Sequence, residues 1–74
     1  MKTADEMFDM IGYEKHKSIV NDLYYENKEN DAIYFYEDTK SFEKINFEKI
    51  ESIEITMKEL QAINKKCQEL GWIK

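Results

Sequence analysis

The apolar positions of this chain follow helical spacing at both ends and strand-like alternation in the middle. The stripe near the N-terminus consists of Ala4, Met7, Phe8 and Ile11. The stripe near the C-terminus consists of Leu60, Ile63, Cys67 and Leu70. Intervals of three and four residues place side chains on one face of a helix. The pattern therefore predicts a short helix over about residues 4–11 and a longer one over about residues 57–70, each burying its stripe.

The same capping sequence precedes both predicted helices. Thr3 is followed three residues later by Glu6, and Thr56 is followed at the same interval by Glu59. In such a capping box the threonine side chain accepts from the glutamate amide, and the glutamate side chain accepts from the threonine amide. The chain's only two glycines follow the two helices, where a left-handed residue ends a helix. No glycine is then left for a phosphate-cradling loop, which argues against a nucleotide-binding loop.

The middle of the chain is rich in Tyr, Phe and Ile, and polar clusters at 27–31 and 38–40 interrupt it. Such clusters are typical of hairpin turns. They leave strands near 19–26, 32–37 and 42–47, and the alternation at 53–55 is compatible with an additional short strand. The connections are too short for parallel crossovers, so we expect an antiparallel meander. The sequence thus predicts a single α+β domain over residues 1–74 with both helices on one face of the sheet, while 48–52 stay unassigned.

Strand alternation assigns side chains to the two faces of the predicted sheet. The helix-facing set is Leu23, Tyr25, Ile33 and Phe35. The outward set is Tyr24, Tyr34 and Tyr36. Phe42 differs in parity from Ile45 and Phe47, so the third strand either contains a bulge or turns one aromatic residue outward.

Composition and charge narrow the classes of function. Apolar residues make up 42% of the 74 residues, enough for a modest core, and Cys67 is the only cysteine, so no intramolecular disulfide can form. The net charge is −5, and all eleven basic residues are lysines. A negative chain without arginine is poorly suited to nucleic acid. No apolar run approaches membrane-spanning length, so we expect a cytoplasmic protein that is neither anchored nor exported.

The residues that carry chemistry are too few for a catalytic site. His16 is the only imidazole, and we expect it to be exposed, whereas Cys67 lies on the buried stripe, where a thiol is inert. One cysteine and one histidine cannot form a closed zinc site, and the acids do not match a calcium loop. Paired acids in turns are usually solvated. We therefore predict a protein that is not an enzyme and uses no metal or cofactor.

Both ends of the chain resemble a family of small prophage-encoded proteins of low-GC Gram-positive bacteria. The resemblance lies in residues 55–72, in the opening 3–8 and in Gly12 and Tyr13. The family has no established activity and no catalytic motif, so the resemblance implies an origin and no site residues. The cytoplasm concerned would be that of the host bacterium.

Two functional hypotheses follow. In the first, a phage accessory protein binds a host or phage protein through the outward tyrosines and the adjoining turn. That candidate surface is Tyr24, Tyr34, Tyr36, Glu37 and Asp38. In the second, an acidic decoy blocks a nucleic-acid site of a host defence or restriction protein. Its acids are Glu26, Glu29, Asp31, Glu37 and Asp38.

The outward tyrosines also bear on self-association. Together with Phe42 they would form an apolar patch, which suggests a weak homodimer. Alternatively, Lys44 and nearby acids screen the rings of a monomer. Tyrosines on an open sheet face also occur as ordinary sheet surface, so the face is either an interface or plain surface.

Overall fold

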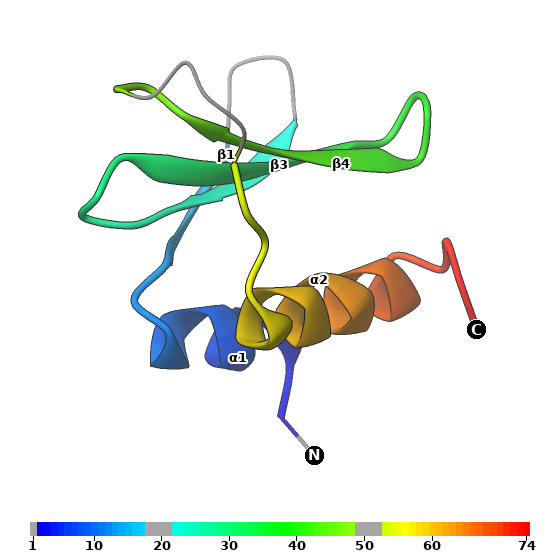
Figure 1. Ribbon diagram of the computed structural model, residues 1–74. Coiled ribbons are helices and arrows are strands. Elements are labelled where there is room, and N and C mark those ends of the chain that lie inside the picture. The colour runs from blue at the N-terminus through cyan, green and yellow to red at the C-terminus, as the bar shows by residue number, and fades with distance from the viewer. Residues whose placement is uncertain (1, 18–21, 49–52) are drawn as a thin grey trace.

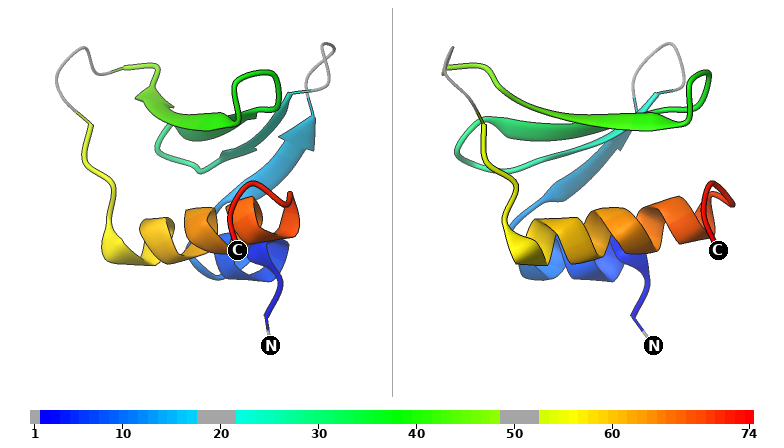
Figure 2. Two further views of the ribbon diagram at one scale, coloured as in Figure 1. Left: turned by 90° about the vertical axis from the view of Figure 1, so that its right-hand side faces the viewer. Right: turned by 45° about the vertical axis from the view of Figure 1, so that its right-hand side comes forward.

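The computed structural model describes residues 2–17, 22–48 and 53–74. Two helices lie side by side on one face of a four-stranded antiparallel sheet, with strand order β1-β2-β3-β4 (Figure 1, Figure 2). The elements in chain order are α1 (Ala4–Met10), β1 (Glu14–Lys17), β2 (Leu23–Glu26), β3 (Asp31–Tyr36), β4 (Ser41–Asn46) and α2 (Met57–Glu69). The predicted α+β class, the meander and the placement of both helices on one face are confirmed.

The fourth strand is not where the sequence suggested it. Residues 53–55 form no strand, and the additional strand is β1 at Glu14–Lys17, at one edge of the sheet. The β1 sequence Glu-Lys-His-Lys has no apolar alternation. It can still form a strand, because an edge strand is held largely by backbone pairing to its neighbour. That neighbour is β2, with Glu14 opposite Glu26 and Lys17 opposite Leu23. Residues 19–21 of the predicted first strand, and most of the unassigned 48–52, lie outside the described residues.

Strand β4 pairs with β3 without a bulge. The register runs from Asp31 opposite Asn46 to Tyr36 opposite Ser41 in unbroken steps. Phe42 therefore lies opposite Phe35 on the helix-facing side, and Ile45 lies on the outer side. The bulge and the outward placement of Phe42 were wrong, because alternation through β4 is regular.

Both helices have the predicted ends. Each capping box is complete, with the threonine side chain accepting from the N3 amide and the glutamate side chain accepting from the N-cap amide. Gly12 has φ of 90° and Gly71 has φ of 78°, both left-handed. The next amides, of Tyr13 and Trp72, each donate over 2.9 Å to a carbonyl five residues back, which is the Schellman arrangement.

The core lies between the helices and the sheet. Phe8 of α1 stacks on Tyr25 of β2 with ring centroids 3.9 Å apart, and both side chains are buried. The helix-facing set from β2 and β3 is confirmed, since Tyr25, Ile33 and Phe35 are buried and Leu23 packs against them. The predicted stripe of α2 was wrong at Leu60, which is 43% exposed. The buried residues of α2 are Glu59, Ala62, Ile63, Lys66 and Cys67.

Candidate binding surface

The outer face of the sheet carries a row of parallel rings that crosses three strands. His16 of β1 stacks on Tyr24 of β2 at 5.1 Å, and Tyr24 stacks on Tyr34 of β3 at 4.6 Å, with interplanar angles of 14° and 15°. Tyr34 is parallel to Tyr36 within 9°, at 6.1 Å. We call these four residues the ring ladder.

Strand pairing alone brings the ring ladder together. His16, Tyr24 and Tyr34 are successive cross-strand partners, and Tyr36 lies two residues beyond Tyr34 on the same face. The outward placement of the three tyrosines agrees with the sequence prediction. His16 was expected to be simply exposed, but it is half-buried on this face, because β1 was not predicted.

The charged side chains of the strands are sorted between the two faces. By register, Glu14, Glu26 and Glu43 share the outer face with the ring ladder. The strand lysines are on the helix-facing side, at Lys15, Lys17 and Lys44. Two of these lysines bind acids of the helices: Lys15 lies 3.1 Å from Asp5, and Lys44 lies 2.9 Å from Glu59. The suggestion that Lys44 screens the outer rings was therefore wrong.

The acids of the outer face affect the tyrosines beside them. Burial, followed by the charges of Tyr24 and Glu26, raises the pKa of Tyr34 above its ordinary value. Burial also raises the pKa of Tyr36, whose hydroxyl donates to Glu43 Oε1 over 3.1 Å. Both hydroxyls therefore remain protonated at neutral pH, and the negative charge of this face resides on carboxylates.

Glu37 and Asp38 follow Tyr36 directly, at the end of β3. Both are exposed in the turn between β3 and β4. Glu37 lines a shallow hollow of about 510 Å³ with Lys15, Lys17 and Leu23, which belong to the helix-facing side. The structure thus brings together the three predicted tyrosines, whereas Glu37 borders the helix-facing side of the sheet.

The acids assigned to a decoy surface are also divided. Glu29 and Asp31 lie at the start of β3, whereas Glu37 and Asp38 follow its end. Six strand residues span about 20 Å, so the two groups of acids lie at opposite ends of the sheet. They form two separate groups of carboxylates, about 20 Å apart.

A second polar cluster, which the sequence did not indicate, surrounds Glu59 at the start of α2. Tyr13 donates its hydroxyl to Glu59 over 2.7 Å, the Thr56 amide donates over 2.9 Å, and Lys44 Nζ lies 2.9 and 3.1 Å from the two carboxylate oxygens. Lys44 also donates to the Glu54 carbonyl over 2.7 Å. The cluster borders an open cleft of about 480 Å³ between the β2–β3 turn and α2.

The charges in this cluster satisfy one another. Burial by itself raises the pKa of Glu59, but the hydrogen bonds from Tyr13, Lys44 and Thr56 outweigh it, and the pKa lies below its ordinary value. Burial, the hydrogen bond to Glu59 and the charge of that carboxylate raise the pKa of Tyr13. The cluster therefore holds an ionised carboxylate that bonds α2 to the sheet and to the loop after α1.

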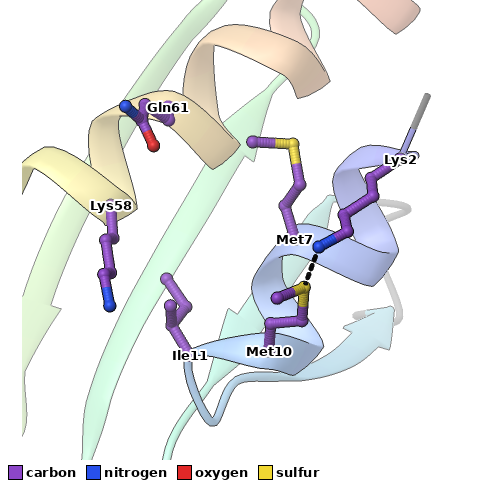
Figure 3. A pocket seen from close by; sticks show the side chains of 6 residues that line it. All are labelled: Lys2, Met7, Met10, Ile11, Lys58 and Gln61. Atoms are coloured by element: carbon purple, nitrogen blue, oxygen red, sulfur yellow. Dashed lines mark hydrogen bonds between the residues drawn. The ribbon is translucent and has the colours of Figure 1, made fainter.

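A smaller pocket lies between the two helices (Figure 3). Its volume is about 230 Å³, which is below the range of about 300–1,000 Å³ that is usual for small-molecule sites. Lys2 Nζ lies 2.9 Å from the Met10 sulfur at its rim. The lining residues are Lys2, Met7, Met10, Ile11, Lys58 and Gln61.

Cys67 is buried, as predicted, and burial raises the pKa of its thiol. Within the described ranges, no three His, Cys, Asp or Glu side chains are arranged to hold a metal ion. No helix in that part of the chain has the length and apolar character to cross a membrane. Comparison with family models, with curated proteins and with solved structures finds no match to this chain.

Proposed function

We propose that this protein acts without catalysis, as a protein-binding module whose contact surface is the outer face of the sheet. The observation that supports the proposal is the ring ladder, which aligns four side chains across three strands on the face opposite the helices. Figure 2 shows both helices on the other side of the sheet in each view.

The physical state of the rings suits an interface. A tyrosine offers a large apolar area with a polar tip and has few rotatable bonds to immobilise on binding. Rings that already stack on strand neighbours have lost much of that freedom before a partner arrives, which lowers the entropic cost of binding. Tyrosine is enriched at protein interfaces for these reasons.

The phage accessory role extends this proposal. It comes from the resemblance of the two chain ends to small prophage-encoded proteins, and the partner would then be a host or phage protein in the cytoplasm of the host bacterium. The resembling segments supply the helix caps, which are structural, so any partner-specific residues belong to the strands between them.

Affinity capture with matched variants tests the contact surface. The tagged wild type is compared with Tyr34→Ser/Tyr36→Ser on the outer face and with Lys58→Ser/Gln61→Ser on the helix layer. Circular dichroism and thermal melting are used to choose a temperature at which the wild type and both variants are folded. We expect one captured protein to be lost with the tyrosine variant and retained with the helix variant. Equal capture by the wild type and the folded tyrosine variant would refute the use of this face.

The acidic decoy remains a special case of the proposal. The turn acids form two groups at opposite ends of the sheet, and Glu14, Glu26 and Glu43 add a row of carboxylates on the outer face. If the captured protein binds DNA or RNA, adding that nucleic acid should displace the chain from it. A ternary complex would exclude the decoy and leave protein binding intact.

A further inference from the structure

We infer that the outer face recognises a basic segment of its partner protein, whose arginine or lysine side chains pair with Glu26 and Glu43 beside the ring ladder. The inference rests on the proposed function, because it specifies the partner of that same face. The observation behind it is that the strand glutamates lie on the outer face of the sheet and the strand lysines on the helix-facing side.

The sorting is complete within the described strands. The outer positions include three glutamates and no lysine, while all three strand lysines are on the helix-facing side. Successive strand residues point to opposite faces, so each charge is assigned by register. A partner that meets the outer face therefore encounters carboxylates with no strand lysine on that face to neutralise them.

The glutamates lie beside the rings. Glu43 is the cross-strand partner of Tyr34 and accepts the hydroxyl of Tyr36. Glu26 is two residues from Tyr24 on the same face of β2. A guanidinium or ammonium group placed here reaches a carboxylate while its methylene stem lies against tyrosine. The Tyr36 hydroxyl donates a hydrogen bond to Glu43, and its oxygen can still accept one.

Charge also argues against the other occupants of this face. A second copy related by two-fold symmetry would place carboxylates of one outer face near those of the other, which is unfavourable. Nucleic acid would bring phosphates to the same carboxylates. A basic protein segment is the occupant whose charge complements this face.

The test uses a defined peptide and two variants of equal net charge. The probe is an eight-residue peptide of alternating arginine and glycine with blocked ends, and a glutamine-for-arginine peptide serves as the neutral control. The first variant is Glu26→Gln/Glu43→Gln. The second is Asp9→Asn/Glu54→Gln, which also removes two exposed carboxylates but from α1 and from the segment before α2. Calorimetric titration at low and physiological salt gives the dissociation constants.

We expect Glu26→Gln/Glu43→Gln to weaken arginine-peptide binding by about three- to tenfold at low salt, since exposed ion pairs are individually modest. The other variant should weaken binding less at low salt, and at physiological salt it should stay within about twofold of wild type. Its lost charges are in α1 and in the segment before α2, and the effect of charges at a distance from the bound peptide is screened as salt rises. Binding should weaken as salt rises, and the neutral peptide should not bind. Equal weakening of the two variants would overturn the inference, because net charge alone would then explain the binding. An unchanged affinity in Glu26→Gln/Glu43→Gln would overturn it as well.

Failure of this inference is distinguishable from failure of the proposed function. A captured protein that is lost with Tyr34→Ser/Tyr36→Ser but binds Glu26→Gln/Glu43→Gln as tightly as wild type, at any salt, would keep the interface and remove the basic partner. Capture that survives the tyrosine substitutions would remove the interface itself.

Discussion

Replacing Lys44 with methionine tests the energetic role of the buried cluster at the start of α2. The Lys44 and Glu59 side chains are only 7% and 9% exposed, and they form an ion pair at 2.9 Å. Methionine keeps most of the aliphatic stem but removes the ammonium group. Glu59 then remains buried, and its donors among residues 2–17, 22–48 and 53–74 are the Tyr13 hydroxyl and the Thr56 amide.

The magnitude follows from the burial of the pair. Removing one partner of a buried ion pair usually costs about 3–5 kcal/mol, because the other charge is left without compensation. We expect a cost of about 3 kcal/mol, at the low end of this range, because two donors to Glu59 remain and the open cleft beside it lets water reach the carboxylate. A chain of 74 residues has a total stability of about 4–11 kcal/mol, so this loss is a large share. The melting temperature should fall by about 12–24 °C.

The same cluster gives the stability a defined pH dependence. The pKa of Glu59 in the folded chain lies below its ordinary value, so the unfolded chain takes up a proton first as the pH falls. The contribution of this carboxylate is therefore complete above the unfolded value of about 4.3 and is lost as the pH falls through the folded value. Glu59→Gln should be less stable than wild type at neutral pH, and the difference should shrink below about pH 4.

Thermal and urea unfolding followed by circular dichroism measure these effects. Lys58→Met is the matched control, since Lys58 is an exposed lysine of α2, the helix that contains Glu59, and its replacement should cost less than about 0.5 kcal/mol. If Lys44→Met melts within about 3 °C of Lys58→Met, less than 1 kcal/mol separates them and the buried pair does not stabilise the fold as argued.

Three further changes test other parts of the structure. Thr56→Ala should cost about 1 kcal/mol by removing the helix cap, and a melting temperature that moves by less than a degree would contradict this. Gly71→Ala should destabilise by about 1 kcal/mol because φ is 78°, although no atom lies within 4 Å of the added carbon, and Gly71→Asn should lose less because asparagine tolerates this conformation. Sedimentation velocity should show a monomer at low salt, because a dimer through the outer face would oppose like charges. Any such dimer should strengthen as salt is added, and one that weakens would contradict the charge argument.

The outward tyrosines of the ring ladder were predictable from the sequence, whereas the positions of His16 and Glu43 beside them were not. The outward placement of Tyr24, Tyr34 and Tyr36 follows from parity along two strands, which needs no knowledge of what they pair with. Glu43 is also outward by parity in β4, but Phe42 in the same strand suggested a bulge and obscured the alternation. His16 could not be placed, because β1 has no apolar pattern and exists through backbone pairing with β2.

The sequence by itself determined the helix ends, the two main turns and the faces of the tyrosine strands. Each depends on residues within a few positions of one another: a threonine and a glutamate three apart, a glycine after a stripe, or alternation along one strand. The tertiary structure decided which side of α2 is buried, so that Glu59 lies inside and Leu60 outside. Glu59 is a cap residue within its helix. Lys44 and Tyr13, which are distant in the sequence, donate to its carboxylate and so offset the free-energy cost of burying the charge.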